Sequence, residues 1–323
     1  MKNWPTLSCL VVALLLGQFS VPAHSQSFPT KTVKIVVPFP GGGGNDLLAR
    51  IVAEKLQTMW GQPVVVENRT GAGGNIGAEA AARAEPDGHT LLVSAPGPLT
   101  VNQVLYRQLG YKPADFVPIS VLAAVPNLIV LRTGIQVKTV PELVSYIKSR
   151  KVNVGSQGPG STPHLTANMF MNMTGTQLAH IPYRGEGPVL NDMVGGHVDL
   201  FFGNVASVRP LYLDKKVNVL AVTDKTRAAS MPDVPTAAEA GLPGFISTAW
   251  FAMVGPPNTP KEIQILISAA VVRALKMPDV QERYRAMGME PVGNTAAEAG
   301  QFIAAENQRW SDVIRKNNIT IEQ

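Results

Sequence analysis

Four consecutive glycines form the part of the sequence best suited to bind a charged group. Gly41–Gly44 follow the apolar segment 34–40 and precede Asn45, Asp46 and a segment with helical spacing. Glycines leave backbone N–H groups uncovered, and the N-terminus of a helix is favourable for negative charge. The order strand, glycine loop and helix therefore predicts a site for an anion, with Asn45 or Asp46 as the N-cap of the helix.

A second glycine-rich loop carries further groups that can act on a ligand. Residues 152–164 again give a strand, a glycine-rich loop and a helix start, with Ser161 as the predicted N-cap. Ser156, Ser161 and His164 also invite a hydrolase interpretation. Val154 stands at the first glycine position of the Gly-x-Ser-x-Gly elbow, so nucleophilic catalysis is disfavoured. His164 is interpreted as a first-turn residue near the site or as a structural histidine.

The first glycine loop also has to be compared with the common nucleotide-binding loops. No Gly-Lys-Ser/Thr follows the glycines, so the Walker pattern fails. The dinucleotide pattern fits better, because Gly42 and Gly44 give Gly-x-Gly and Glu67 ends the next predicted strand, but Leu47 replaces the third glycine. An anion site is favoured over a nucleotide site, a purely structural loop is the other alternative, and no cofactor is predicted.

Composition and spacing give little support for metal or nucleic-acid binding. His89, His180 and His197 show no metal-ligand spacing, so no metal site is predicted. The 323-residue chain has a net charge of +5, but its Lys and Arg residues are scattered and only 6% of its residues are aromatic. No nucleic-acid partner is therefore expected.

The N-terminus has the pattern of a secretory signal peptide. Lys2 precedes the apolar run 10–16, and Ala23-His-Ser25 provides small residues before a cleavage point at Gln26. Residues 1–25 are predicted to be removed, which places the mature protein in the periplasm. The single cysteine, Cys9, precedes the apolar run, so no lipid attachment is expected.

The two glycine loops must be positioned by the sheet that contains their strands. The unit of strand, glycine loop and helix recurs after residues 62–67, and strands continue to alternate with helices. This alternation predicts a mostly parallel sheet whose ligands bind at the carboxyl ends of the strands.

Helix signals recur along the chain. The first helix is predicted to end at Gly61 and to have an apolar face formed by Leu47, Leu48, Ile51, Val52, Leu56, Met59 and Trp60. Thr139 and Glu142 form a capping box, and Thr236 and Glu239 form another, which predicts a helix ended by Gly241.

Two apolar segments are predicted to connect two domains. Residues 117–131 and 248–254 read as strands that leave one domain and enter the other. Domain 1 is predicted to contain residues 26–125 and 247–323, and domain 2 residues 126–246. The expected architecture is an α/β clamshell with a hinge.

Several motifs occur along the chain in one order. They are Ile35-Val-Val-Pro-Phe-Pro-Gly-Gly-Gly, Val66-Glu-Asn-Arg, Gly71-Ala-Gly-Gly-Asn-Ile-Gly-Ala, Pro86-Asp-Gly, Gly155-Ser-Gln-Gly-Pro-Gly-Ser with His164, and His180-Ile-Pro-Tyr-Arg-Gly. In these motifs the chain resembles the Bug-type receptors of tripartite tricarboxylate transport systems, from about Phe28 to the C-terminus. The opening loop departs from the family pattern, because Gly41 replaces an expected second proline and Asn45 an expected threonine or serine.

The resemblance implies an extracytoplasmic solute-binding protein with a type II-like periplasmic-binding-protein fold and no catalytic activity. It implies that a ligand's carboxylate is held in the cleft between the first strand–helix loop and the glycine–serine loop of the second domain. The ligand-binding residues expected on this basis are Phe39, Gly42, Gly43, Gly44, Asn45, Asp46, Ser94, Ser156, Gly158, Gly160, Ser161, His164 and Asn204. The expected partners of this monomer are two integral membrane subunits of a transporter. A ligand sensor for a membrane signalling protein is the alternative.

Several of these residues have a second interpretation. Asp46 can bond an amino group of the ligand or act as an N-cap. Arg184 can meet a second carboxylate or lie in an exposed turn. Asn204 follows the predicted strand 198–202. Its side chain is interpreted either as facing the cleft or as part of a turn. Phe39 and Trp250 line the pocket or pack in the core.

The ligand class follows from energetics and from charge. Micromolar binding requires about 8 kcal/mol, whereas one helix terminus supplies at most ~2 kcal/mol, so both loops are needed. Few Lys or Arg residues lie in these loops, which argues against a compact tricarboxylate. A small mono- or dicarboxylate with an aromatic or aliphatic body against Phe39 is expected, in preference to citrate.

Overall fold

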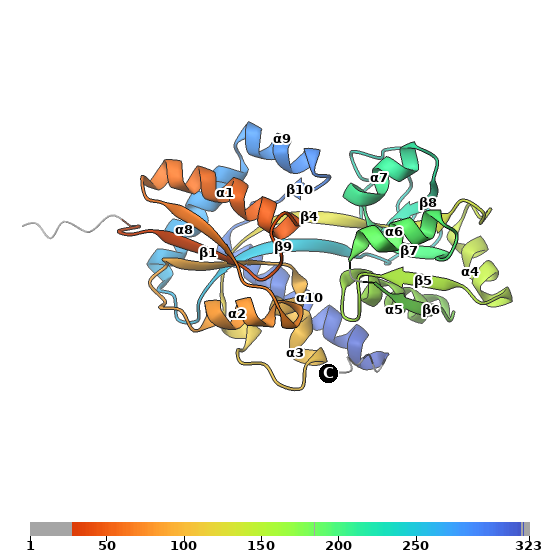
Figure 1. Cartoon of the computed structure of the whole chain (residues 1–323), viewed down its shortest axis with the longest axis horizontal. Coiled ribbons are helices and arrows are strands. Elements are labelled where there is room, and N and C mark those ends of the chain that lie inside the picture. The colour runs from red at the N-terminus through yellow and green to blue at the C-terminus, as the bar shows by residue number, and fades with distance from the viewer. Residues whose placement is uncertain (1–27, 184, 318, 320–323) are drawn as a thin grey trace, which may run out of the picture.

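The computed structural model describes residues 28–183, 185–317 and 319 (Figure 1). The predicted signal peptide and Arg184 lie outside these residues. Within them the chain forms two α/β domains that lie side by side and contribute to one ten-stranded sheet. The strand order is β2-β1-β3-β9-β4-β7-β5-β6, and β10 and β8 also pair with β4.

The first domain contains the N-terminal parallel strands. β1 (Val33–Val37) pairs in parallel with β2 (Val64–Asn68) and with β3 (Thr90–Ser94). The other elements on this side are α1 (Gly44–Trp60), η1 (Ala72–Gly74), α2 (Asn75–Ala82), η2 (Gly97–Val101), α3 (Asn102–Leu105), η3 (Pro113–Asp115), α8 (Lys261–Leu275), α9 (Pro278–Ala286), β10 (Glu290–Pro291) and α10 (Ala296–Lys316).

The second domain repeats the parallel arrangement. β5 (Asn153–Ser156) pairs in parallel with β6 (Ala179–Pro182) and with β7 (Leu200–Asn204). The remaining elements are α4 (Val140–Ser149), α5 (Thr162–Thr174), α6 (Glu186–Val194), α7 (Val205–Leu213) and β8 (Val217–Val222). Both glycine loops therefore follow parallel strands, as the alternation of elements predicted.

Two long strands, β4 (Val117–Arg132) and β9 (Thr248–Gly255), connect the domains. β4 pairs with β9 as far as Pro126 and with β7 from Asn127 onward. Buried polar side chains join the strands at this point. The Asn127 side-chain amide donates to the Ser247 hydroxyl over 3.0 Å, and the Thr166 hydroxyl of α5 lies 2.5 Å from the same oxygen. The predicted crossing by two strands is confirmed.

The ends of α1 agree only in part with the sequence signals. Gly61 caps the C-terminus in the left-handed conformation, with φ 65°, as predicted. The predicted N-cap is wrong, because the helix begins at Gly44 and Gly43 is the N-cap. Asp46 lies in the first turn, and its carboxylate accepts a hydrogen bond from the Gly42 N–H over 2.8 Å instead of capping the helix.

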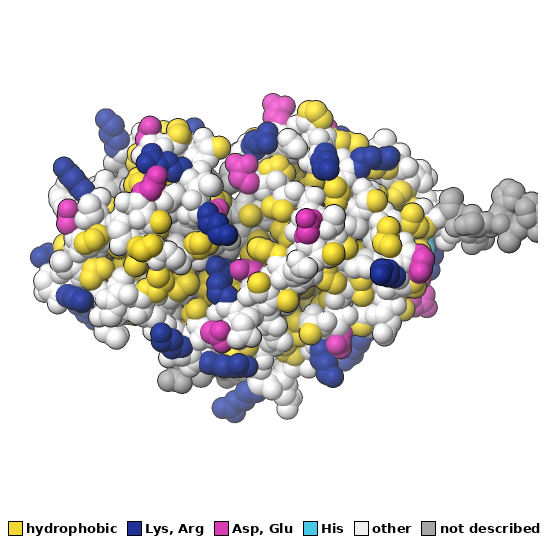
Figure 2. All heavy atoms as spheres, turned by 180° about the vertical axis from the view of Figure 1, so that it is seen from behind, with side chains coloured by type: hydrophobic (Ala, Val, Ile, Leu, Met, Phe, Trp, Pro, Cys, Tyr) yellow, Lys and Arg dark blue, Asp and Glu magenta, His cyan; other side chains and the backbone are white. Residues whose placement is uncertain are grey.

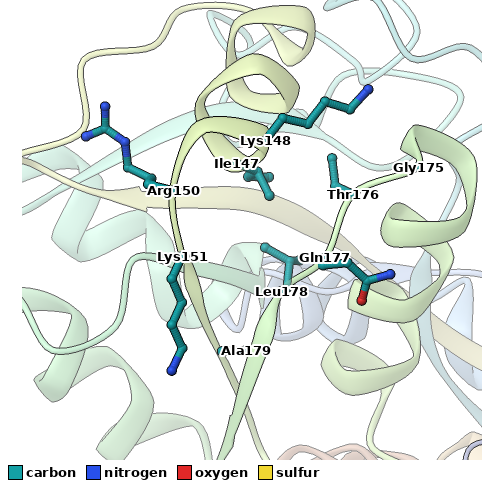
Figure 3. Close-up of a pocket in the computed structure, with 9 residues that line it drawn as sticks. All are labelled: Ile147, Lys148, Arg150, Lys151, Gly175, Thr176, Gln177, Leu178 and Ala179. Carbon is teal, nitrogen blue, oxygen red and sulfur yellow. The ribbon is translucent and has the colours of Figure 1, made fainter.

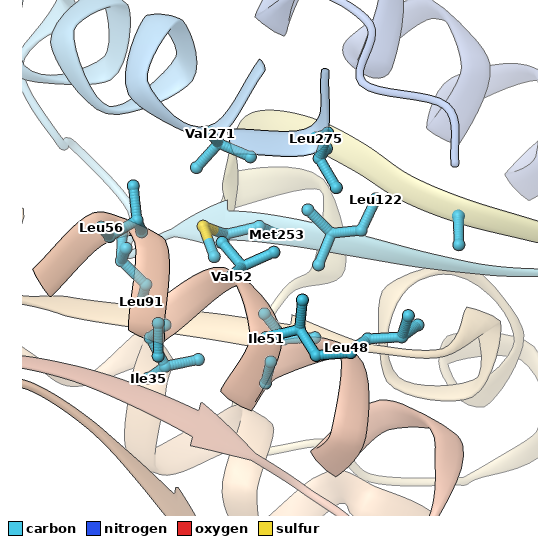
Figure 4. Packing of buried hydrophobic residues seen from close by; sticks show 14 of the residues in the cluster. Ile35, Leu48, Ile51, Val52, Leu56, Leu91, Leu122, Met253, Val271 and Leu275 are labelled. Carbon is cyan, nitrogen blue, oxygen red and sulfur yellow. The ribbon is translucent and has the colours of Figure 1, made fainter. Parts of the chain in front are cut away.

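The apolar face of α1 packs against the sheet and α8 (Figure 4). Leu48, Ile51, Val52 and Leu56 are buried in this core, with Met59 and Trp60 packed at its margin. Leu47, predicted on the same face, is instead 39% exposed, because it lies at the rim of the apolar stripe.

The predicted helix at residues 236–241 is also wrong. The capping-box hydrogen bonds form, since the Thr236 N–H donates to Glu239 over 2.8 Å and the Glu239 N–H donates to the Thr236 hydroxyl over 3.1 Å. The segment nevertheless forms a parallel bridge from Thr236 to Val222 and then turns. Gly241 has φ 100° and Pro243 follows, so the chain cannot continue as a helix.

α10 runs from the first domain along the second (Figure 1). Ala299 packs in the core of the first domain, whereas Trp310 packs with residues of the second. Glu306, between them, accepts hydrogen bonds from the indole N–H of Trp250 over 2.9 Å and of Trp310 over 3.0 Å. Trp250, fully buried, is thus a core residue that ties α10 to β9.

Candidate functional site

A cavity of about 340 Å3 lies where loops of the two domains meet. Phe39, Gly73 and residues 95–97 line it from beyond the carboxyl ends of β1, β2 and β3. Residues 157 and 159–162 and Gly185 line it from beyond β5 and β6. The other lining residues are Val101, Asn102, Leu105, Tyr106, Leu165 and Trp310. Open α/β sheets bind ligands at this edge, so the cavity is the candidate site.

The first turn of α5 contributes backbone donors to the cavity wall. Ser161 is the N-cap, as predicted, but its hydroxyl donates to the Gly158 carbonyl over 2.6 Å and makes no capping bond. Pro163 has no N–H, so the Ser161 side chain leaves the amides of Thr162 and His164 uncovered, and of these two residues Thr162 lines the cavity. Such a helix terminus at a cavity wall is suited to a carboxylate.

The glycines before α5 adopt conformations that other residues avoid. Gly158 has φ 111° and Gly160 has φ 77°. A Cβ atom on Gly160 would lie 2.5 Å from the Cδ1 atom of Leu105, the last residue of α3. Gly160 is therefore required both by the turn and by the close approach of the Leu105 side chain.

Two stacked histidines support this loop from behind. The rings of His164 and His180 are 4.2 Å apart at an angle of 25°. His164 Nδ1 accepts a hydrogen bond from the Gly160 N–H over 3.1 Å. Burial, together with the neighbouring His180, lowers the pKa of His164 to about 4. The imidazole is therefore neutral near pH 7, as this acceptor role requires.

Ser156 is paired with the second of these histidines. Its hydroxyl oxygen lies 2.6 Å from His180 Nε2 and accepts a hydrogen bond from the Gly158 N–H over 3.0 Å. The Ser156 side chain is fully buried, so it cannot meet a substrate as a nucleophile would. Ser156, His164 and His180 thus position the loop, and neither Ser156 nor His164 lines the cavity.

The first glycine loop reaches the cavity through one side chain. Phe39 lines the cavity, whereas Gly42, Gly43, Gly44 and Asn45 do not. The Asp46 carboxylate is held by Gly42, by Arg50 Nε over 3.0 Å and by Asn68 Nδ2 over 3.0 Å. The hydrogen bond from Arg50 is the main cause that lowers the pKa of Asp46 to about 2. An internal anion therefore already occupies the N-terminal end of α1.

Two other candidate residues lie away from the cavity wall. Ser94 is fully buried, and its hydroxyl donates to the Ala95 carbonyl over 3.1 Å. Asn204 ends β7 and is the N-cap of α7. Its N–H and side-chain amide donate to the Glu186 carboxylate over 3.0 and 3.2 Å. Burial raises the pKa of Glu186.

The cavity also includes residues that the sequence did not single out. Gly73 belongs to the glycine loop after β2, whose position at the same sheet edge was expected. A Cβ atom on Gly73 would lie 2.5 Å from the Tyr106 hydroxyl, and Asn102 Nδ2 donates to the Gly73 carbonyl over 3.1 Å. Gln157 and Thr162 lie in the second loop. Trp310 was not predicted as a site residue, because it enters the wall from the far end of the chain.

A second hollow lies at the outer end of the second domain, between α4 and β6, and has a volume of about 500 Å3 (Figure 3). Lys148, Arg150 and Lys151 border it, but their side chains point in different directions (Figure 3). These three side chains therefore do not converge on one point where a ligand could bind. On the face shown in Figure 2, Lys and Arg side chains are dispersed among acidic and apolar ones.

In residues 28–183, 185–317 and 319, no three His, Cys, Asp or Glu side chains gather in a way that would hold a metal ion. No helix in the same part of the chain is long and apolar enough to cross a membrane.

The chain is similar over most of its length to one family of receptors. Residues 48–319 match the family described as tripartite tricarboxylate transporter family receptor. Protein BugT of Bordetella pertussis is 34% identical over 98% of this chain and 98% of its own length. A protein of Agrobacterium vitis is 37% identical, over 94% of this chain and 90% of its own.

Solved structures show the same architecture. The structure of R. palustris Rpa4515 with adipate is 36% identical with a TM-score of 0.80, and the match covers 91% of this chain and 100% of that one. MatC from Rhodopseudomonas palustris with bound malate is 35% identical with a TM-score of 0.76, over 89% of this chain and 100% of its own. The periplasmic binding protein BugD is 33% identical with a TM-score of 0.76, over 91% and 100%.

The fold and the cavity between the domains define a periplasmic binding protein. The chain belongs to the Bug-type receptor family of tripartite tricarboxylate transporters, as its motifs predicted. This is a family of solute-binding receptors rather than of enzymes.

Proposed function

We propose that this protein captures a small organic carboxylate outside the cytoplasm and delivers it to a transporter with two integral membrane subunits. The observation that carries the proposal is the cavity between loops of both domains, whose wall contains the first turn of α5. The adipate and malate in two of the similar structures also support a carboxylate ligand.

In this proposal the carboxylate lies against the first turn of α5, and Phe39, Gly160 and Ser161 contact the ligand. Ser156, Gly158 and His164 act by holding the loop in its shape. Gly42–Asn45, at the N-terminal end of α1, do not line the cavity in this structure and join the site when the two domains close. Asp46 and Asn204 are positioning residues, because their polar groups bond within the protein.

The proposal also includes the domain boundaries and the oligomeric state of the receptor. Boundaries at residues 125/126 and 246/247 are supported by β4, which exchanges β9 for β7 after Pro126. We propose that the receptor is a monomer whose two domains close about β4 and β9. The alternative role, a sensor for a membrane signalling protein, uses the same site and differs only in the partner that recognises the liganded form.

A thermal-shift screen of organic acids tests the proposal most broadly. A ligand at one hundred times its dissociation constant adds about 2.7 kcal/mol to the free energy of unfolding. At least one carboxylate is expected to raise the melting temperature. A response to sugars or nucleotides alone would show that the anion site is misassigned.

Two substitutions test whether both loops are needed. Ser161→Gln and Gly43→Gln are each expected to weaken binding about tenfold or more, because each disturbs donors worth ~1.5 to 3 kcal/mol. The matched control is Gly187→Gln, at an exposed position of α6 where a Cβ atom meets nothing within 4 Å. Calorimetry that gives full affinity for both loop variants would contradict a site shared by the two loops.

A further inference from the structure

The side-chain amide of Asn102 has only one orientation that suits its neighbours. Asn102 is the first residue of α3 and lines the cavity. Its Nδ2 atom lies 3.1 Å from the Gly73 carbonyl oxygen, which can only accept hydrogen bonds. The Asn102 nitrogen must therefore face Gly73. Both of its hydrogens are used, because it also donates to Asn75 Oδ1 over 2.6 Å.

Asn75, the first residue of α2, holds the Asn102 amide in this orientation. Both side chains are buried. The Tyr111 hydroxyl donates toward Asn75 Oδ1 and toward the Pro98 carbonyl oxygen, over 3.0 Å in each case. A flip of either amide would bring two oxygens or two N–H groups together, which is costly in a buried network. The protein itself therefore fixes which atom of the Asn102 amide is left for a ligand.

The atom that is left is the oxygen. Among the described residues Asn102 Oδ1 accepts no hydrogen bond, and it is not one of the side-chain atoms there that are buried without a partner, so it is open to the cavity. Gly97, which also lines the cavity, has no side chain to cover this oxygen. A Cβ atom on Gly97 would lie 3.4 Å from Asn102 Oδ1 and 3.7 Å from the Gly73 carbonyl oxygen. Two acceptor oxygens thus flank one point of the cavity wall.

A hydrogen-bond donor suits the point beside Gly97, whereas a carboxylate does not. The Gly73 carbonyl oxygen can accept a second hydrogen bond in addition to the one from Asn102. A carboxylate placed there would face two oxygens and receive a donor from neither, which is unfavourable away from bulk water. A hydroxyl can donate to either oxygen. An ammonium group fits less well, because no Asp or Glu is among the described residues that line the cavity.

Resting on the proposed function, we propose that the carboxylate ligand also carries a hydroxyl group, which donates to the pair of acceptors formed by Asn102 Oδ1 and the Gly73 carbonyl oxygen. Asn102 is a specificity-determining residue in this assignment, and Asn75 is a positioning residue that orients the Asn102 amide. The two acids in the similar structures differ in this respect, because malate carries a hydroxyl and adipate does not.

Pairs of acids that differ by one hydroxyl test the proposal by calorimetry on the mature protein. The pairs are malate and succinate, lactate and propionate, 3-hydroxybutyrate and butyrate, and mandelate and phenylacetate. The hydroxy acid is expected to bind about tenfold more tightly in at least one pair, because its analogue leaves an acceptor in the cavity unpaired.

Three results would overturn the inference and leave the proposed function intact. The first is that no hydroxy acid binds more tightly than its analogue. The second is that other carboxylates bind and none of these four hydroxy acids does. The third is that aspartate or alanine binds more tightly than malate or lactate, which would assign the point beside Gly97 to an ammonium group. If no carboxylate of any kind binds, the proposed function itself fails.

Two substitutions test whether the preference for a hydroxyl arises at this point of the wall. Gly97→Ala places a methyl group at ordinary contact distance from Asn102 Oδ1 and removes no side-chain hydrogen bond. Asn102→Leu removes the acceptor itself. In each variant the affinity ratio of the hydroxy acid to its analogue is expected to fall to within about twofold of one. An unchanged ratio in Gly97→Ala, with a normal melting temperature, would overturn the assignment even if Asn102→Leu does not fold.

Tyr111→Phe is the matched control for damage to the buried network. It removes the hydroxyl that bonds Asn75 and Pro98 but leaves the Asn102 oxygen and the Gly73 carbonyl in place. This variant should lose stability in thermal unfolding and keep the wild-type affinity ratio within about twofold. A ratio that falls as far in Tyr111→Phe as in Asn102→Leu would show that the effect is structural and would overturn the role of Asn102 in specificity.

Discussion

Replacing Gly160 by alanine should weaken ligand binding at least tenfold. Gly160 has φ 77°, and an alanine Cβ atom there would lie 2.5 Å from the Leu105 Cδ1 atom. The left-handed conformation costs an alanine about 1–2 kcal/mol. The overlap with Leu105 adds to this cost. A loss of about 1.4 kcal/mol in binding free energy already corresponds to a factor of ten.

Gly175→Ala is the matched control for backbone strain. Gly175 caps the other end of α5 with φ 63°, and a Cβ atom there meets nothing within 4 Å. Both variants should lose stability in thermal unfolding, but only Gly160→Ala should lose affinity in calorimetry. Gly160→Ala should also cost less affinity in a Leu105→Ala background, because the overlapping methyl group is then absent. Equal affinities for Gly160→Ala and Gly175→Ala would refute the close approach at the site.

Three further predictions concern acid, the α10 contact and the N-terminus. The pKa of His164 is lowered from 6.5 to about 4 in the folded protein, so the unfolded chain binds more protons between these values. The free energy of unfolding should therefore fall as the pH drops from about 6.5 to about 4. His164→Gln should flatten this pH dependence when the free energy is measured by urea titration. The same pH dependence in His164→Gln and in the wild type would contradict the lowered pKa of His164. Glu306→Ala leaves the indole N–H groups of Trp250 and Trp310 unpaired and should lower the free energy of unfolding by about 3 kcal/mol. Glu306→Gln should lower it less. Equal stability of Glu306→Ala and the wild type would contradict the contact. Mass spectrometry of the exported protein should find an N-terminus near Gln26, and a mature chain that retains residues 1–25 would exclude cleavage.

The sequence predicted the strands and their crossings because these have strong local signals. Residues 117–131 and 248–254 are apolar over lengths that suit strands, and they form β4 and β9. Gly61 signals a helix end through its conformational freedom alone, so its role did not depend on distant contacts. Where a tertiary contact competes, the local signal fails. Asp46 bonds Gly42, Arg50 and Asn68 rather than capping α1 as the sequence suggested.

The cavity was less predictable than the fold. The loop at Gly160 and Ser161 is visible as a glycine motif, and both residues line the cavity. Leu105, Leu165 and Trp310 look like ordinary helix core residues, and only tertiary packing brings them to one wall. The stacking of His164 on His180 joins residues sixteen positions apart on neighbouring elements, so no spacing rule identifies it.

The most direct measurement is a crystal structure of the mature protein with the tightest-binding acid from the thermal-shift screen. The ligand's carboxylate should lie within hydrogen-bond distance of the Thr162 N–H at the start of α5. Its body should contact Phe39 and the wall that contains Leu105. A carboxylate bound in the hollow beside Lys148 and Lys151, or anywhere else outside the cavity between the domains, would contradict the account.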